Sequence, residues 1–498
     1  MTAPAKPADR LADILDRWEP VIGIEVHCQL RTASKMFCAC STAYDGAAPN
    51  THTCPVCLGL PGTLPTINRA AVEHVLATGL AIGATVPART QWERKNYFYP
   101  DLPKGYQISQ YAIPLAADGT LIVETSEGPF EVRIRRAHLE EDTAKLIHAE
   151  ASGRRVSLVD FNRSGAPLME IVTEPVVRTG EQARRYAEEL QLLLRAIGAS
   201  DADMERGQMR VEANVSLRPR GDEAFGTRVE VKNMNSFRSV ERAIAFEIER
   251  QATALESGEP LVQETRGWDD GRQATYRMRL KETSEDYRYF PEPDLPPLTV
   301  SEAWLTVVRS ALPELPATRR SRYAGLGLSA YDASVLVADP AMTVAFEAIR
   351  TAGPALPAKD VANLVTGDYG RAAKLSTTRG PEGLVDRADA GELADLLARV
   401  ADGSLSRPNA KEVFTEHLET GAPVATIIDR RGLRQISDTS ALDALIDEVL
   451  AANPSAVADV AAGKPQAIGF LVGQVMKASK GQANAALVQA AVRERVGG

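Results

Sequence analysis

The sequence predicts an α+β protein in which an antiparallel β-sheet with helices comes first and an all-helical region follows. Apolar and polar residues alternate in many short stretches before residue 290, and alanine- and leucine-rich helical patterns replace them afterwards. The proline cluster Pro291–Pro297 separates the two patterns, and a second break lies near Pro423. We therefore expect domains at 1–298, 299–425 and 426–498.

Length and composition indicate a globular protein of several domains. The chain has 498 residues, too many for one core, and 44% of them are hydrophobic and 25% charged. No apolar run reaches the roughly 18–20 residues that span a bilayer, and no segment has the pattern of a signal peptide. We expect a cytoplasmic protein with no membrane contact. A net charge of −9 restricts any nucleic-acid binding to local surfaces or to recognition of shape.

The first strong strand signal is the stretch Val21–Leu30. Its even positions are apolar from Ile22 onward, whereas Glu25, His27 and Gln29 fall on the other parity. Since successive side chains of a strand point to opposite faces, Glu25 and His27 share a face, with Cα atoms roughly 6.5–7 Å apart. A carboxylate and an imidazole at that spacing can share one metal ion. An ordinary half-exposed strand remains the alternative from this stretch alone.

All five cysteines lie between residues 28 and 57. Four of them form a C-x-C-x13-C-x2-C pattern of two close pairs, which places four thiolates within reach of one ion. Clustered cysteines in a cytosolic chain favour a metal over disulfides, and four thiolates bind Zn²⁺ tetrahedrally without leaving an open position. We therefore predict one structural Zn²⁺, and its ligands are Cys38, Cys40, Cys54 and Cys57. Four buried free thiols are the alternative.

The remaining elements of the first domain follow from the same periodicities. A short amphipathic helix within 1–17 precedes the first strand. The patterns then predict helices over 68–82, 181–197 and 239–257, and strands over 131–135, 156–161, 168–172, 209–218 and 228–232.

Several acids occupy unusual places in these strands. Glu140 and Glu141 stand in a run of three acids just after a strand and close to His138, where a solvated turn is the alternative. Glu170 interrupts an otherwise apolar strand, and acids are almost never buried unless they are paired. These residues are candidate metal ligands or ion-pair partners. The strand over 209–218 carries a strictly polar face, which is typical of the floor of a polar cleft.

Several familiar catalytic motifs are missing from the sequence. It has no P-loop, no G-x-G-x-x-G, no H-E-x-x-H and no G-x-S-x-G. It also lacks the Gly-Gly-Ser-Ser stretch of the Ser-cisSer-Lys amidases. If the protein uses ATP, the nucleotide site is not a P-loop, and if an amide is hydrolysed, another chain supplies the nucleophile.

Long blocks in a fixed order identify a resemblance to a known family. The blocks are VIGIEVHCQL at 21–30, RKNYFYPDLPKGYQISQ at 94–110, RAHLEED at 136–142, LVDFNRSGAPLMEIVTEP at 158–175, MRVEANVSLRP at 209–219, EVKNMNSF at 230–237 and DYRYFPEPDLPPL at 286–298. With these, and with GFLVGQVMKASKGQAN near its end, the chain resembles the B subunits of the aspartyl/glutamyl-tRNA(Asn/Gln) amidotransferases, GatB of the GatCAB complexes. The resemblance covers the whole chain.

The resemblance implies a fold and a reaction. The fold is a cradle domain with a kinase site over 1–298, a helical domain over 299–425 and a small YqeY-like tail over 426–498 that contacts tRNA. In these heterotrimers GatA, an amidase, releases ammonia from glutamine, and the small GatC joins the two larger chains. GatB uses ATP to phosphorylate the side-chain carboxylate of Glu-tRNA(Gln) or Asp-tRNA(Asn), and ammonia displaces the phosphate. Such a protein is a glutamine-dependent carbon–nitrogen ligase; which of the two products is physiological stays open.

The resemblance also implies roles for particular residues. Glu25, His27 and Glu170, with one or both of Glu140 and Glu141, would hold a catalytic Mg²⁺, and Glu141 is the assigned ligand of the pair. The expected contacts to ATP are Lys104, Arg163, Arg210 and Lys232.

Two alternatives come from other classes. A zinc-dependent hydrolase requires an open zinc position, which four thiolates do not leave. A non-catalytic tRNA-binding scaffold would tolerate loss of Glu25 and Glu170. The tail is basic from Lys464 onward. Composition alone would suit a solvated helical face, but together with the resemblance it favours contacts to RNA phosphates.

Overall fold

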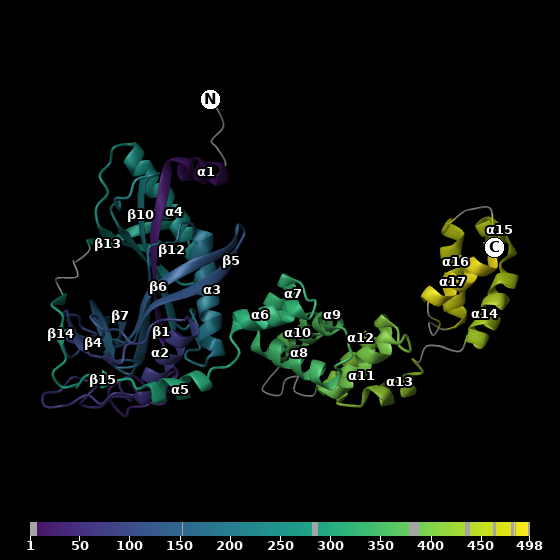
Figure 1. The fold of residues 1–498 in the computed structure, drawn as a ribbon, viewed down its shortest axis with the longest axis horizontal. Helices are drawn as coiled ribbons and strands as arrows, with labels where there is room; N and C mark the ends of the chain where they lie inside the picture. The colour runs from purple at the N-terminus through teal and green to yellow at the C-terminus, as the bar shows by residue number, and fades with distance from the viewer. Residues whose placement is uncertain are drawn as a thin grey trace. The chain divides into compact units, whose positions relative to one another are not determined.

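The computed structural model of the chain describes residues 7–151, 153–280, 287–377, 388–433, 439–461, 465–479, 483 and 485–496. The chain divides into two compact units, Met1–Pro316 and Ala317–Gly498 (Figure 1). The first unit contains the sheets and the second is helical, so the predicted fold class is confirmed. The predicted boundaries after residues 298 and 425 stay a prediction.

The first unit is built on one large sheet with the strand order β13-β12-β11-β10-β1-β9-β6-β5. Every neighbouring pair is antiparallel except β11 and β12, which run parallel. Its strands are β1 (Trp18–Gln29), β5 (Ala116–Thr125), β6 (Gly128–Glu141), β9 (Pro167–Thr173), β10 (Met209–Pro219), β11 (Val229–Met234), β12 (Glu264–Asp269) and β13 (Ala274–Leu280).

The central strand β1 shows why one face of this sheet is covered and the other is polar. Ile22, Ile24, Val26 and Cys28 are at most 1% exposed, whereas the alternate residues are half-buried. Burying each such aliphatic side chain stabilises the fold by about 1.5–3 kcal/mol. The buried face packs against helices α2 (Arg69–Ala81), α3 (Gly180–Ala196) and α4 (Phe237–Glu256), which share one core with it, and Figure 1 shows α3 and α4 lying along the sheet.

Side-chain caps fix where these helices begin. The Asn68 side chain accepts a hydrogen bond from the Ala71 amide at the start of α2, and Thr179 caps α3 in the same way. Such caps satisfy one of the free amide groups of the first helical turn and contribute about 1 kcal/mol each.

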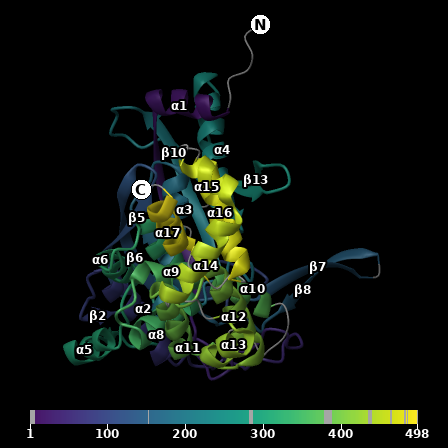
Figure 2. The same ribbon diagram turned by 90° about the vertical axis from the view of Figure 1, so that its right-hand side faces the viewer.

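Smaller elements complete the first unit. They are α1 (Pro7–Arg17), β2 (Arg89–Thr90), β3 (Glu93–Asn96), β4 (Tyr106–Ser109), β7 (Lys145–Ala151), β8 (Arg154–Asp160), β14 (Phe290–Pro291), β15 (Leu298–Thr299) and α5 (Glu302–Ser310). Strands β14, β3 and β4 form a three-stranded sheet. Strands β7 and β8 form a hairpin that reaches away from the large sheet in Figure 2.

The second unit consists of helices in its described part. They are α6 (Pro316–Gly325), α7 (Ala330–Ala338), α8 (Pro340–Ala352), α9 (Ala358–Leu364), the π-helix η2 (Val365–Tyr369), α10 (Gly370–Thr377), α11 (Ala390–Ala401), α12 (Arg407–Thr420), α13 (Val424–Arg431), α14 (Thr439–Ala452), α15 (Pro454–Ala461), α16 (Pro465–Ala478) and α17 (Ala485–Val496). Helices α14, α16 and α17 bury Ile446, Leu471 and Val488 in a small core of their own. Within the described residues, no helix combines the length and the apolar character needed to cross a membrane.

Candidate functional site

Three neighbouring strands place chemically active side chains in one row on the open face. Strand β9 lies between β1 and β6, and Glu170 of β9 is directly opposite His27 of β1 and His138 of β6. Directly opposite residues of paired strands share a face of the sheet. The row His27–Glu170–His138 is therefore dictated by strand register.

The adjacent rows complete a polar grid. Glu25 and Arg136 are both opposite Val172, and Glu140 is opposite Leu168. On the far side of β1, strand β10 adds further polar neighbours, because Arg210 pairs with His27 and Glu212 pairs with Glu25.

We call Glu25, His27, His138, Glu140 and Glu170 the acid–histidine cluster. The His27 Nε2 atom lies 3.7 Å from a carboxylate oxygen of Glu25, 3.2 Å from one of Glu140 and 3.5 Å from one of Glu170. The His138 Nε2 atom lies 3.4 Å from the same Glu170 oxygen. Two triads of donor atoms lie within 4.8 Å of one another, one from Glu25, His27 and Glu170 and one from His138, Glu140 and Glu170.

The electrostatics of the cluster are strongly coupled. Burial, with the nearby Glu170 carboxylate, raises the pKa of Glu25 to about 7. Burial opposes ionisation of Glu170, but the His138 and His27 imidazoles hold its pKa well below the usual value. Burial likewise disfavours a charged His27, yet hydrogen bonds to Glu140 and Glu170 raise its pKa well above the usual value. Three acids with only two imidazoles attract a cation.

The cluster residues Glu25, His27, Glu140 and Glu170 line a cleft of about 470 Å³ whose other walls are cationic and aromatic. Lys95 of β3 faces the cluster. Burial disfavours its charged form, but the nearby Glu140, Tyr289 and Glu170 outweigh burial, so the pKa of Lys95 lies well above the usual value. The Lys95 ammonium lies 5.1 Å from the ring centroid of Tyr287. Tyr289 stacks on Tyr111 with ring centroids 4.4 Å apart.

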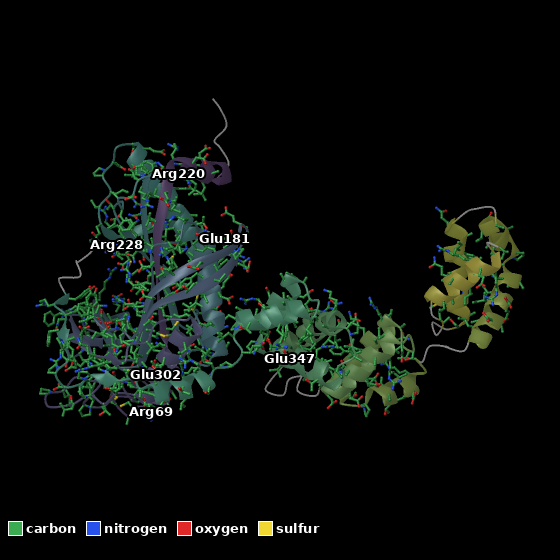
Figure 3. The ribbon with its side chains drawn as sticks, viewed as in Figure 1. Arg69, Glu181, Arg220, Arg228, Glu302 and Glu347 are labelled. Atoms are coloured by element: carbon green, nitrogen blue, oxygen red, sulfur yellow. The ribbon has the colours of Figure 1, made fainter. Side chains whose placement is uncertain are left out.

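The opposite part of the cleft is lined by cations of strands β10 and β11. The Arg210 guanidinium lies 3.2 Å from Asp142, and the Lys232 ammonium lies 2.6 Å from Glu212. Arg228, labelled in Figure 3, immediately precedes β11 and lines the same cleft. Negative groups of a substrate would therefore meet cations from several sides.

The structure does not bring every predicted residue to this cleft. Because Glu141 follows Glu140 in a strand, its side chain points to the other face, where it forms a buried ion pair with Lys104 and accepts a hydrogen bond from the Ile108 amide. Arg163 donates to the backbone carbonyls of Thr143 and Ala144. Of the four cations assigned to ATP, Arg210 and Lys232 line the cleft, and Lys104 and Arg163 do not.

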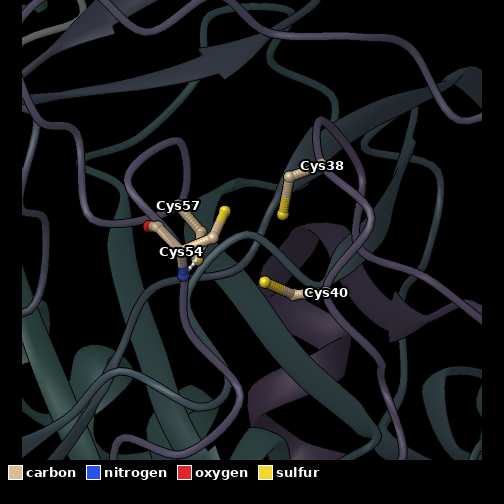
Figure 4. Close-up of side chains that lie close together, drawn as sticks. All are labelled: Cys38, Cys40, Cys54 and Cys57. Atoms are coloured by element: carbon tan, nitrogen blue, oxygen red, sulfur yellow. Dashed lines mark hydrogen bonds between the residues drawn. The ribbon is translucent and has the colours of Figure 1, made fainter.

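The four predicted zinc ligands come together from two turns. Figure 4 shows the sulfurs of Cys38, Cys40, Cys54 and Cys57 pointing toward one another, all within 4.8 Å. The Cys54 and Cys57 sulfurs are 3.9 Å apart, and a tetrahedral ion with Zn–S bonds of about 2.3 Å needs sulfurs about 3.8 Å apart. The Cys54–Cys57 pair therefore has the spacing of two ligands of one zinc ion.

Lys35 is the cation of this cysteine cluster. It is 1% exposed, and its ammonium donates to the carbonyls of His52 and Phe161 and to the Cys57 sulfur at 3.5 Å. Hydrogen bonding from Cys38, aided by the Lys35 charge, lowers the pKa of Cys57 to about 4. The fifth cysteine, Cys28, lies on the buried face of β1, where burial raises the pKa of its thiol to about 12.

Sequence reasoning did not assign a role to His138, a member of the cluster, or to Lys95, which faces it. His138 is recoverable from alternation, because it stands two residues before Glu140 on the same strand. Lys95 carried no such signal, since β3 belongs to a different sheet from the strands that hold the acids. The tyrosines at 287 and 289 are brought in from more than 100 residues away in the sequence.

Comparisons with known proteins match this architecture. The family model described as the GatB/GatE catalytic domain matches residues 20–306, which contain the cleft and both clusters, and the model described as the GatB domain matches residues 345–496. The chain belongs to the family of aspartyl/glutamyl-tRNA(Asn/Gln) amidotransferase B subunits. A relative with that name from Moorella thermoacetica is 50% identical over 96% of this chain and all of its own length.

Other relatives of the same name agree over nearly full length. The one from Bordetella pertussis is 49% identical over 96% of this chain and all of its own length. The one from Roseiflexus sp. is 48% identical over 95% of this chain and 97% of its own. Since both family models and these relatives together span almost the whole chain, the family includes the sheet unit and the helical unit alike.

Proposed function

We propose that this chain is the kinase component of a tRNA-dependent amidotransferase. It would phosphorylate the side-chain carboxylate of Glu-tRNA(Gln) or Asp-tRNA(Asn) with ATP, so that ammonia from a partner amidase can form the amide. The observation that carries the proposal is the acid–histidine cluster facing Lys95 in a cleft of the matched catalytic domain. The relatives carry the amidotransferase name, which favours this function over a scaffold or a zinc hydrolase.

The chemistry explains why the cleft needs this composition. A carboxylate is a poor electrophile, so one of its oxygens attacks the γ-phosphorus of ATP and ADP leaves. Ammonia then attacks the carbonyl carbon, and phosphate leaves with an oxygen that came from the carboxylate. Phosphoryl transfer depends mainly on positioning and on positive charge around the phosphates.

The cations of the cleft suit these charges. Lys95 lies beside the acid–histidine cluster, and Arg210 and Lys232 line the part of the cleft nearest β10 and β11. We assign Lys95, rather than Lys104, to the reacting phosphate, because Lys104 is engaged by Glu141 on the other face of the sheet. The tyrosines offer ring faces on which a base or a ribose can lie.

The donor set fits a hard divalent cation such as Mg²⁺ or Mn²⁺. Glu25, His27 and Glu170 would hold it, and Glu140 faces the same cleft in place of the Glu141 assigned from sequence. The nitrogen ligand makes Mn²⁺ as suitable as Mg²⁺, and when bound such an ion neutralises phosphate charge. The protein's own part is to present these carboxylates without water, and burial of Glu140 and Glu170 achieves this.

The cysteine cluster would hold a structural Zn²⁺. Its four sulfurs leave no position for a substrate, and it lies on the loops between β1 and α2 rather than in the cleft. A zinc there would fix those loops against the turn that precedes β9, because the Met36 amide donates to the Gly165 carbonyl and the Ser164 hydroxyl donates to the Cys57 carbonyl.

The partners follow from the reaction. An amidase of the GatA type would supply ammonia and a small chain of the GatC type would join the assembly, because this sequence has no amidase motif of its own. The tail would contact tRNA through Lys477 and Arg493, while Arg495 is paired with Asp443 and Asp447. The other two tail lysines, Lys464 and Lys480, lie outside the described residues.

The test is Glu170→Gln in the assembled heterotrimeric enzyme. The change removes the central carboxylate of the cluster without altering side-chain volume, so tRNA-dependent ATP hydrolysis should fall at least 100-fold. Glutamine hydrolysis by the partner should stay measurable. Glu174→Gln is the matched control, since Glu174 is on the same chain segment but pairs with Arg135 at 2.8 Å outside the cluster. Full amidation by the Glu170 variant would place the kinase site elsewhere.

A further inference from the structure

A second hollow lies beside the cleft, at the end of the large sheet where β1 finishes. Its volume is about 430 Å³, within the range of about 300–1,000 Å³ that small-molecule sites occupy. Because β9 and β10 are antiparallel to β1, the end of β1 meets the starts of β9 and β10 here. Gln29, Pro167 and Gln208 line the hollow from these three places, and Tyr44 lines it from the loop that follows Cys40.

One hydrogen-bonded row separates the hollow from the cleft. The Gln29 side-chain amide donates to an Asp142 carboxylate oxygen at 2.9 Å, and the Arg210 guanidinium donates to the other oxygen at 3.2 Å. Gln29 lines the hollow, whereas Asp142 and Arg210 line the cleft. Gln29 stands two residues after His27 on the same polar face of β1, so their Cα atoms are roughly 6.5–7 Å apart. A ligand in the hollow is therefore one short chain away from the acid–histidine cluster.

The lining of the hollow has the groups that recognise adenosine. The side-chain amide oxygen of Gln208 is buried, and no donor among the described residues reaches it, which is unfavourable unless a ligand supplies one. A glutamine amide matches the N6 amino group and the N7 atom of adenine through two hydrogen bonds. Tyr44 supplies an aromatic ring of the kind on which unpaired bases stack, and the Asp45 carboxylate can accept a hydrogen bond from a ribose hydroxyl.

The length of an aminoacyl group matches the step from the hollow to the cluster. An extended chain advances about 3.3–3.6 Å for every three bonds, so the side-chain carboxyl carbon of a glutamyl ester lies about 6 Å from the ribose oxygen that carries it. The Cα atoms of Gln29 and His27 are separated by nearly the same distance. A terminal adenosine in the hollow therefore presents its glutamyl carboxylate at the acid–histidine cluster.

Charge favours the adenosine of tRNA over that of ATP. Burial opposes ionisation of Asp142, but the Arg210 and Arg163 guanidinium groups hold its pKa below the usual value. A triphosphate that left the hollow for the cleft would cross this carboxylate, whereas an uncharged ester crosses it without repulsion. At the outer rim, the Arg31 and Arg206 side chains are largely exposed. Their surface ion pairs contribute little, so the phosphates of preceding nucleotides can take these cations.

We propose that the hollow binds the 3′-terminal adenosine of the aminoacyl-tRNA and that Gln208 reads its adenine. The identity of this substrate rests on the proposed function. Arg31 and Arg206 then contact the phosphates that lead to the terminal nucleotide, and the row of Gln29 and Asp142 supports the aminoacyl group on its way to the cluster. Gln208 thereby orients the substrate without touching the reacting atoms.

The experiment removes one hydrogen bond from either partner in the assembled heterotrimeric enzyme. Glu-tRNA(Gln) ending in adenosine is compared with the same tRNA ending in purine riboside, which lacks the N6 amino group. Wild-type enzyme should prefer the adenosine end about 10-fold in kcat/KM and in tRNA affinity. Gln208→Leu, which keeps the side-chain volume, should accept both ends equally. Gln191→Leu is the matched control, because Gln191 binds the Ala202 carbonyl in the segment before Gln208 but does not line the hollow, and it should keep the preference.

The same enzymes are given ATP or purine riboside triphosphate as phosphoryl donor. If Gln208→Leu removed a preference between these nucleotides and left the preference between tRNA ends unchanged, the hollow would hold ATP and the proposal would be overturned. Equal use of both tRNA ends by the wild type overturns it without any variant, so a variant that fails to fold does not protect it. Amidation without that preference refutes only this inference. Tighter binding of the adenosine end through Gln208, with no phosphorylation of Glu-tRNA, refutes only the proposed function.

Discussion

Lys35→Met tests whether the cysteine cluster is a zinc site whose charge is balanced from within the chain. Four thiolates and one Zn²⁺ carry a net charge of −2, and the buried Lys35 ammonium at 3.5 Å from the Cys57 sulfur reduces it. Methionine keeps most of the side-chain volume but removes the charge and the three donors. Two half-buried carbonyls, those of His52 and Phe161, then lose this partner.

The expected magnitude follows from these contacts. A buried carbonyl left without a partner costs about 1–3 kcal/mol; because these two carbonyls are only half-buried and the methionine adds apolar contacts, the chain should lose about 1–3 kcal/mol of stability in all. Removing a group that hydrogen-bonds a metal ligand lowers metal affinity about 10–100-fold. Zinc affinity should therefore fall by that factor.

Competition with a chromogenic chelator measures the affinity, and urea denaturation of the zinc-loaded chain measures the stability. Lys145→Met is the matched control, because Lys145 is an exposed lysine of the same unit at the start of β7. It should change neither quantity. If Lys35→Met bound zinc within threefold of the wild-type affinity, the charge argument would be refuted, and chain purified without chelator that contained no zinc would refute the site itself.

Three further predictions concern the cleft, the buried pair and the tail. Lys95→Met should lower kcat of tRNA-dependent amidation about 10²–10³-fold with the partner's glutaminase rate unchanged; equal kcat would exclude Lys95 from the reaction. Lys104→Met leaves the buried Glu141 carboxylate without its ion-pair partner and should lower the free energy of unfolding in urea by about 3 kcal/mol; an unchanged midpoint would contradict the ion pair. Deleting residues 439–498 should weaken tRNA binding in filter assays and flatten its salt dependence; equal affinity at matched ionic strength would show that the tail makes no tRNA contact.

The sequence predicted the open face of the sheet through strand periodicity. Alternation along β1 placed Glu25 and His27 on one face, and the lone acid in β9 marked Glu170. The same rule distinguishes Glu140 from Glu141 only when β6 is known to continue to residue 141, whereas the sequence pattern predicted a strand ending near residue 135. The sequence therefore could not separate Glu141 from Glu140, because strand boundaries are where local patterns carry least information.

Other parts of the cleft depend on contacts that no local pattern contains. Lys95 lines the cleft from β3, which belongs to the separate sheet β14-β3-β4, and Lys104 meets Glu141 across 37 residues. The strand pairings that create the row through Glu170 join residues 143 positions apart, from His27 to Glu170. Periodicity gives the face on which a side chain lies, but the choice of neighbouring strand is a property of the whole domain.

The central claim is that the side-chain carboxylate of the aminoacyl-tRNA is phosphorylated before it is amidated. Glu-tRNA(Gln) labelled with ¹⁸O in its side-chain carboxylate, supplied with ATP and glutamine to the assembled enzyme, tests this directly. Because phosphate leaves with a carboxylate oxygen, the inorganic phosphate released should carry one ¹⁸O atom for each amide formed from fully labelled substrate. Release of unlabelled phosphate during amidation would show that ATP is hydrolysed by water instead, and the account of the cleft as a carboxylate kinase would be wrong.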